Sequence, residues 1–247
     1  MTERLHFDNV SISVGDTPTV FDVTLSIEAH SLHVLMGPNG SGKSTLLNAV
    51  MGHPRYKVTG GRLTIDDDDL TSLDPEEKAR KGLMLSMQYP PEIAGVTLLN
   101  FLHRAHRALH SSEDSVFDFY REVEAIAQSI GVDASFLKRP VGTGLSGGEK
   151  KQAEILQLLA LKPKFVLLDE IDSGVDVDAM KKILRGIEML RSQGVGLLIV
   201  THYGATLKDL SPDVVHVLHS GRIVATGDNT LATRVTTNGF EDFAPLI

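Results

Sequence analysis

The pattern G-x-x-x-x-G-K-[ST] occurs in this chain as Gly37-Pro38-Asn39-Gly40-Ser41-Gly42-Lys43-Ser44, and Thr45 follows it directly. An apolar run from Leu32 to Met36 precedes the motif and reads as a buried strand, and the run from Leu46 to Met51 reads as the start of a helix. Glycines leave room for backbone N–H groups to surround phosphate oxygens, and the helix directs the positive end of its dipole to the same place. Lys43 adds a positive charge for the outer phosphates, and Ser44 offers a hydroxyl to magnesium. The motif therefore predicts a site for a nucleoside triphosphate with Mg²⁺.

A second apolar run, Phe165 to Leu168, ends in the two carboxylates Asp169 and Glu170. A buried parallel strand would deliver both side chains to the carboxyl edge of a sheet, where ligands of open α/β sheets bind. Asp169 is then the candidate ligand for Mg²⁺, and Glu170 the candidate general base for an attacking water. The alternative is a buried strand that ends in a solvated acidic turn, and the phosphate loop favours the catalytic interpretation.

The run Leu145-Ser146-Gly147-Gly148-Glu149 opens another predicted helix and forms a second candidate anion site from N–H groups and a hydroxyl. One nucleotide does not need two such loops from one chain. We therefore expect Ser146, Gly147 and Gly148 to cap the γ-phosphate of ATP held by another protomer. This hypothesis implies a head-to-tail dimer with two ATP molecules between the subunits.

The elements that must position these residues follow from the hydrophobic pattern. Residues 4–36 alternate and then become apolar, which predicts a small antiparallel sheet leading into the phosphate-binding strand, and a short strand is expected at Arg62 to Ile65. Residues 96–138 have helical spacing without a strand pattern, which predicts a helical lobe inserted into an α/β body. Strands and helices then alternate, which predicts a mostly parallel sheet covered by helices. The predicted elements are a helix from about Gly148 to Leu161, a strand at Phe165–Leu168, a helix at Asp176–Arg191, and strands at Val195–Val200, Val214–Leu218 and Arg222–Thr226.

Two groups of metal-ligating residue types have simpler interpretations. Asp66 to Asp69 are consecutive, so they cannot all converge on one ion, and we favour a solvated hairpin turn. His103, His106 and His110 fall on one helical face without a carboxylate in step, and we favour a solvated polar face over a transition-metal site.

Composition excludes several classes of protein. The 247 residues carry a net charge of −8, so general electrostatic attraction to nucleic acid or an anionic membrane is not expected. There is no cysteine, which excludes disulfides, thiolate catalysis and cysteine-ligated iron–sulfur sites within this chain. No apolar stretch reaches the ~20 residues of a membrane span, and the beginning, Met1-Thr2-Glu3-Arg4, lacks a signal-peptide pattern. We expect a cytoplasmic protein that does not insert into a membrane.

Taken together, the phosphate loop, the Leu145–Glu149 run, Asp169-Glu170 and the later His202 resemble the ATPase domain of ABC proteins. The resemblance covers nearly the whole chain and implies an ATPase that uses Mg²⁺. It implies that Gln88 joins the body to the helical lobe and senses magnesium and the attacking water. It also implies that Ser173–Asp176 crosses the dimer interface and that His202 contacts the γ-phosphate. Without the resemblance, a single His at a strand end is more often structural.

Among ABC proteins, the chain most resembles the SufC family, the ATPases of iron–sulfur cluster assembly. The runs that carry it are Gln88–Val96, Ser146–Lys151, Asp169–Gly174, Thr201–Tyr203 and Val215–Val224. The resemblance implies SufB- and SufD-like scaffold partners, bound around Tyr89-Pro90-Pro91 and the adjacent helical lobe, and a transient ATP-dependent homodimer that strains them. The missing cysteines fit a subunit that supplies work and leaves cluster ligation to its partners.

The expected organisation is one ABC ATPase domain over residues 1–247. Residues 1–88 and 165–247 would form the catalytic body, with a mixed sheet core and an N-terminal antiparallel β subdomain, and residues 96–161 the helical lobe. Val14 stands where many ABC ATPases have an adenine-stacking aromatic residue, and Gln152 where SufC-like sequences have Arg. For Lys150 and Lys151 we favour a solvated helix face. The alternatives are the ATPase subunit of a membrane importer and a nucleic-acid-associated ABC ATPase.

Overall fold

A six-stranded sheet carries the candidate catalytic residues in the computed structural model, which describes residues 3–86, 92–201 and 209–243. The strand order is β12 (Arg222–Gly227), β11 (Val214–His219), β3 (Leu32–Met36), β10 (Gly196–Val200), β9 (Phe165–Asp169), β6 (Leu83–Ser86). Neighbouring strands are parallel except for β11 and β12. Every residue of β3, β9 and β10 is buried, because both faces of the sheet are covered and these strands are correspondingly apolar.

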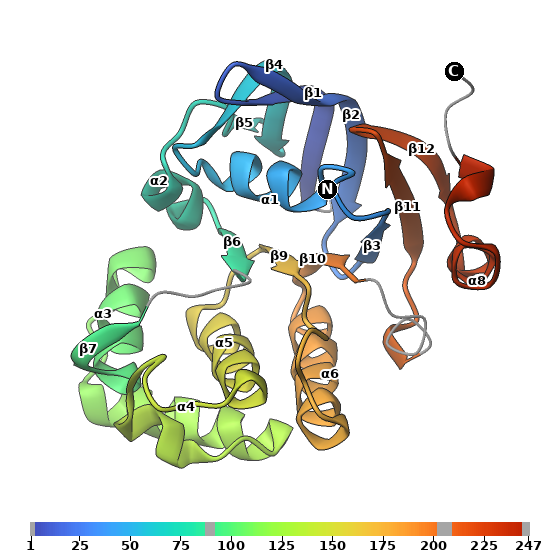
Figure 1. Ribbon diagram of the computed structural model, residues 1–247. Coiled ribbons are helices and arrows are strands. Elements are labelled where there is room, and N and C mark those ends of the chain that lie inside the picture. The colour runs from blue at the N-terminus through green and yellow to red at the C-terminus, as the bar shows by residue number, and fades with distance from the viewer. Residues whose placement is uncertain (1–2, 87–91, 202–208, 244–247) are drawn as a thin grey trace.

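A four-stranded antiparallel sheet covers one face, in the order β2 (Thr17–Glu28), β1 (Arg4–Val14), β4 (Tyr56–Ile65), β5 (Asp68–Asp69). Between the two sheets lies helix α1 (Lys43–Met51), and side chains from all three form one hydrophobic cluster (Figure 1). The predicted strand at Arg62–Ile65 is longer than expected, because β4 begins at Tyr56 and includes Gly60 and Gly61.

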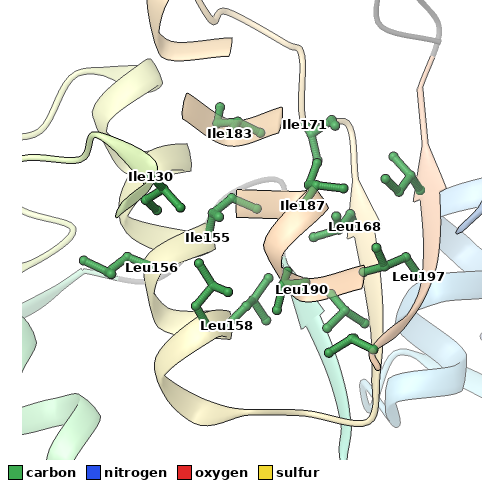
Figure 2. Close-up of a cluster of buried hydrophobic side chains, with 14 of the residues drawn as sticks. Ile130, Ile155, Leu156, Leu158, Leu168, Ile171, Ile183, Ile187, Leu190 and Leu197 are labelled. Carbon is green, nitrogen blue, oxygen red and sulfur yellow. The ribbon is translucent and has the colours of Figure 1, made fainter. Parts of the chain in front are cut away.

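Helices cover the other face of the six-stranded sheet. Helices α5 (Gly147–Leu161) and α6 (Val177–Ser192) lie against it, and α3 (Leu98–His110) and α4 (Val116–Ile130) pack beyond α5 (Figure 1). Figure 2 shows Ile155 and Leu158 of α5 facing Ile187 and Leu190 of α6, with Leu168 of β9 in the same cluster. The smaller elements here are β7 (Ile93–Thr97), the 3₁₀ helix η1 (Ala134–Lys138) and β8 (Pro140–Val141).

The structure confirms the predicted α/β fold, with its mixed sheet and N-terminal antiparallel sheet. The larger elements without a counterpart in the prediction are helix α2 (Pro75–Arg80), strand β6 and helix α8 (Asn229–Asn238), which precedes the 3₁₀ helix η2 (Glu241–Phe243). The segment 96–138 was expected to lack strands, yet its first two residues end β7, which pairs with β8. No helix of the described ranges is long and apolar enough to cross a bilayer.

The histidines of α3 do not form the solvated face that we expected. His103 and His106 are buried, and the His106 ring lies 5.1 Å from the ring of Phe119. The nitrogens of His103 and His110 lie 2.9 and 2.8 Å from the carbonyl oxygens of Asp114 and Leu161. Packing of α4 and α5 against α3 therefore buries this face, which the sequence of α3 alone does not reveal.

The run Asp66 to Asp69 is exposed, as expected, and belongs to a hairpin in which Asp66 and Asp67 form the turn and Asp68–Asp69 form strand β5. Asp68 pairs with Lys81 at 2.8 Å, and Asp69 pairs with Arg62 at 2.9 Å. Over the residues that the structure describes, no three His, Asp or Glu side chains form a group that could hold a metal ion.

Candidate active site

The phosphate loop joins the end of β3 to the start of α1, and its backbone requires glycine at several positions. Gly40 and Gly42 have φ angles of 78° and 106°, in the region that side chains disfavour. A Cβ on Gly37 would lie 2.1 Å from the carbonyl oxygen of Leu218 in β11. The loop therefore leaves its N–H groups uncovered by side chains, which is the property that a phosphate cradle needs.

Lys43, the first residue of α1, turns back into this loop. Its Nζ donates hydrogen bonds to the carbonyl oxygens of Gly37 at 2.9 Å and Pro38 at 3.0 Å. Burial lowers the pKa of the Lys43 ammonium, and the charges of Glu170 and Asp169 act in the opposite direction. The structure thus places a buried cation at the loop, within the field of both carboxylates.

Asp169 is the last residue of β9 and is only 3% exposed. Burial raises the pKa of its carboxyl group, and the hydroxyl of Ser44 is the main opposing influence. Within the described ranges, its Oδ1 atom is buried without a hydrogen-bond partner. A buried carboxylate oxygen that lacks a partner, next to a hydroxyl, provides the hard oxygen ligands that Mg²⁺ prefers.

Glu170 follows β9 in a left-handed backbone conformation, with a φ of 49°. Its N–H donates to the carbonyl oxygen of Val200 at the end of β10, at 3.1 Å. This turn takes the chain off the sheet one residue after Asp169, so both carboxylates belong to the same sheet edge. Left-handed non-glycine residues of this kind concentrate at functional sites.

Ser146 caps α5 and is exposed. Its Oγ accepts a hydrogen bond from the N–H of Glu149 at 3.3 Å, and the Glu149 carboxylate accepts one from the N–H of Ser146 at 2.8 Å. Among the described residues, no hydrogen bond joins Ser146 to the phosphate loop of the same chain. The structure therefore brings together Lys43, Ser44, Asp169 and Glu170, but leaves Ser146 on a separate surface.

This separate surface also includes the segment before α6. A Cβ on Gly147 would lie 3.3 Å from the carbonyl oxygen of Gly174, and one on Gly148 would lie 3.1 Å from Cβ of Ala179. Val177, the first residue of α6, is 73% exposed. The predicted second anion site and the segment Ser173–Asp176 therefore lie side by side.

Gln88 and His202, and also Tyr89-Pro90-Pro91, lie outside the described residues. The residue before His202 is Thr201, whose buried hydroxyl donates to Asp172. This hydrogen bond ties the end of β10 to the segment that follows Glu170.

The prediction of a solvated helix face was wrong for Lys151. Its side chain is buried, with Nζ 3.0 Å from Oε2 of Glu154, and Ser86 donates to the same oxygen at 3.0 Å. Burial raises the pKa of Glu154, whereas the charge of Lys151 lowers the pKa of Asp169. Sequence reasoning missed this buried network, although Lys151, Glu154 and Leu158 share a helical face, which was an available signal. Lys150 does lie at the surface, 2.9 Å from Glu92.

Comparison with known proteins relates this chain to ATP-binding proteins of the ABC type. The family model described as "ABC transporter" matches residues 20–173. The chain is 43% identical to the "Probable ABC transporter ATP-binding protein SpyM3_0208" of Streptococcus pyogenes, over 97% of this chain and 94% of that protein. It is 45% identical to "Vegetative protein 296" of Bacillus subtilis, over 89% and 85% of the two chains.

A further relative is named as an ATP-dependent transporter. The chain is 39% identical to the "Probable ATP-dependent transporter ycf16" of Cyanophora paradoxa, over 97% of this chain and 94% of that protein. Among solved structures, MJ1267, an ATP-binding cassette of an ABC transporter, superposes with a TM-score of 0.79 at 25% identity, over 96% of both chains.

Proposed function

This chain belongs to the ABC transporter family of ATP-binding proteins, and from that premise we propose that it is the ATPase of a SufC-type machine that assembles iron–sulfur clusters. It binds and hydrolyses ATP as an ABC ATPase. In our proposal residues 1–247 act as one cytoplasmic ATPase unit, with the helical lobe at 96–161. Its ATP-driven dimerisation moves a scaffold of SufB- and SufD-like proteins.

The juxtaposition of Lys43, Asp169 and Glu170 at one sheet edge is the observation that carries the assignment of the ATP site. We assign Lys43 and the N–H groups of the phosphate loop to the triphosphate, and Glu170 to orientation and deprotonation of the attacking water. Gln88 and His202 complete the proposed set through their places in the sequence.

Ser44 and Asp169 are the residues that would hold Mg²⁺, with Gln88 as a further candidate. When bound, the ion would neutralise charge on the triphosphate. The partnerless Oδ1 of Asp169 supports this assignment, because an isolated buried carboxylate oxygen is costly unless a cation or a donor satisfies it.

The second half of each ATP site comes, in our proposal, from the partner subunit. Ser146 is exposed, and among the described residues it has no hydrogen bond to the phosphate loop of its own chain. The neighbouring Val177 is an exposed apolar side chain. A head-to-tail dimer would bring Ser146, Gly147 and Gly148 over the nucleotide of the partner and would cover Val177.

A cleft of about 440 Å³ between the catalytic body and α3 supports a protein partner. Its lining is mostly apolar and includes Met84 of β6, Phe101 and Leu109 of α3, and Leu145 and Leu158 near α5. The strand β6 that lines it leads directly to the segment 87–91. We propose that a scaffold helix with an apolar face docks in this cleft.

The SufC-type assignment rests on the sequence runs that resemble that family and on the absence of cysteine. The second candidate is the ATPase subunit of a membrane transporter, because the relatives in Streptococcus pyogenes carry the name of a transporter ATP-binding protein. Both candidates share the phosphate-site residues and differ in the partner.

Affinity purification of the tagged chain from its native cytosol and membranes distinguishes the two candidates. We expect soluble SufB- and SufD-like proteins to co-purify, and recovery of an integral membrane permease instead would overturn the assignment. Leu109→Asp, in the cleft, should abolish co-purification and leave ATP affinity unchanged. The matched control is Val116→Asp, which places the same charge on an exposed position of α4.

A further inference from the structure

The turn between β11 and β12 contacts the phosphate loop, although the two are far apart in the sequence. His219 pairs with Arg222 across this turn, and the two central residues, Ser220 and Gly221, have φ angles of 48° and 78°. Positive φ at both central positions is the signature of a type I′ hairpin turn. The backbone of the turn is therefore sharply defined.

Gly221 joins the phosphate loop to β2 through its own backbone. Its N–H donates to the carbonyl oxygen of Ser41 at 2.9 Å, and its carbonyl oxygen accepts from the N–H of Phe21 at 2.8 Å. β11 also meets the first residue of the loop, because the carbonyl oxygen of Leu218 occupies the space beside Gly37. The loop is thus held at its beginning and at its middle by the same hairpin.

The hydrogen bond between Gly221 and Ser41 also fixes the direction of the next N–H group, that of Gly42. In a trans peptide the C=O and N–H groups point in opposite directions. Because the carbonyl of Ser41 points outward to Gly221, the N–H of Gly42 points to the opposite side, which the loop encloses. Gly42 can hold this orientation because its φ of 106° is open to glycine alone.

The surroundings of Gly221 leave no room for a side chain. A Cβ there would lie 2.2 Å from the carbonyl oxygen of Thr19 and 2.9 Å from Cδ2 of Phe21. Arg222 fixes the turn further, since its guanidinium lies 2.8 Å from Asp22 and 5.1 Å from the centre of the Phe21 ring.

We propose that the β11–β12 turn is a positioning element of the ATP site, in which the N–H of Gly221 fixes the Ser41–Gly42 peptide so that the Gly42 N–H faces the phosphates. The inference rests on the nucleotide site proposed above and adds Gly221 to it as a positioning residue. It predicts that substitutions in the turn lower the affinity for the phosphate groups and leave the contacts with the nucleoside unchanged.

The first test compares Gly221→Ala with Gly239→Ala. Gly239 has a φ of 77° and nothing within 4 Å of its Cβ position, so the control shares the positive φ without the contact. We expect Gly221→Ala to weaken binding of Mg-ATP and Mg-tripolyphosphate by about tenfold each, on the scale of one or two hydrogen bonds. Gly239→Ala should leave both affinities unchanged. Both variants must be shown to be folded by circular dichroism at the temperature of the calorimetry, because a reversibly unfolded fraction would by itself raise the apparent dissociation constant.

A second variant tests the hydrogen bond if Gly221→Ala does not fold. Replacing Gly221 by glycolate changes the amide to an ester, which removes the N–H donor without adding a side chain. We expect about a fivefold loss of tripolyphosphate affinity, on the scale of one hydrogen bond. Unchanged affinity, or a loss for ATP but not for tripolyphosphate, would overturn the inference. Lys43→Ala serves as the reference: if it retains tripolyphosphate, the proposed phosphate site itself is wrong, whereas its loss with an unaffected ester rejects only the role of Gly221.

Discussion

Glu170 combines a reactive group with a strained backbone. A left-handed non-glycine residue costs of order 1–3 kcal/mol and persists where its surroundings define it. The hydrogen bond from its N–H to Val200 and the rigid end of β9 supply that definition. The strained backbone is therefore maintained at the residue that we propose as the general base.

Glu170→Gln should therefore abolish ATP turnover, because an amide cannot accept a proton from water, while ATP binding remains. Turnover is measured as phosphate release, and binding by calorimetry. We also expect the variant to accumulate as a dimer with ATP in size-exclusion chromatography. The control is Glu188→Gln on the exposed face of α6. Wild-type turnover in Glu170→Gln would remove Glu170 from its role.

A buried histidine pair makes stability depend on pH. His33 of β3 and His216 of β11 are both buried, with ring nitrogens 3.1 Å apart, and His216 also lies 3.0 Å from the Thr226 hydroxyl. Burial, followed by the neighbouring His33, lowers the pKa of His216 from 6.5 to about 4. The folded protein therefore holds this histidine neutral where the unfolded chain is protonated.

This stabilisation is fully present above pH 6.5 and is lost as the pH falls toward 4. Between pH 7 and pH 5, His216 alone should lower the free energy of unfolding by about 2 kcal/mol. His216→Gln should reduce that pH dependence by a similar amount in urea titrations. The exposed His30→Gln is the control, and an unchanged slope for His216→Gln would contradict the prediction.

At the scale of elements, the contact between α5 and α6 depends on one missing side chain. A Cβ on Gly186 of α6 would lie only 2.1 Å from Cγ2 of Ile155 in α5. The two helices bring the Ser146 cap and the start of α6 to one surface, so their spacing sets the geometry of the proposed second half-site. The close packing of α5 against α6 at Gly186 therefore helps to set the geometry of the proposed second half-site.

Gly186→Ala should destabilise the fold by about 1–2 kcal/mol, because overpacking outweighs the gain of about 1 kcal/mol in helix propensity. Ile155→Ala removes the clashing methyl group, so the double variant should be more stable than the sum of the two single variants predicts. Chemical denaturation of the four proteins measures this coupling. Strict additivity would show that the helices adjust without strain.

In the proposed dimer each ATP site is shared by two molecules, since within the described residues the Ser146 side chain bonds with Glu149 and not with the phosphate loop of its own chain. Hydrolysis by the isolated chain should therefore be slow, and the specific activity should rise with protein concentration or with added partners. Full activity that is independent of concentration and partners would reject the shared site.

Mixing two inactive variants tests the shared site directly. A dimer of Lys43→Ala with Ser146→Arg retains one complete site, formed by the phosphate loop of the second variant and the Ser146 surface of the first. Since half of randomly paired dimers are mixed and each has one of two sites, an equal mixture should recover about a quarter of the activity. Each variant alone, at the same total protein concentration, should show no ATPase activity.

Much of this organisation follows from local sequence. The glycines of the phosphate loop, the apolar run before Asp169 and the cap at Ser146 predict their own backbone conformations, because turn sterics and hydrogen bonds act over a few residues. The sheet order and the register of β4 are less local. The predicted strand begins at Arg62, yet pairing with β1 extends β4 back to Tyr56, with a register shift between Arg62 and Gly60.

The sequence by itself determined the class of the protein, its phosphate loop and the two carboxylates. Each of these features consists of residues that are neighbours in the sequence, so local interactions set its conformation. Only the tertiary structure decided that Lys151, His103 and His106 are buried and that Gly221 meets Ser41. Burial and long-range hydrogen bonds depend on which element packs opposite a residue, and the periodicity of one helix or strand does not specify its neighbour.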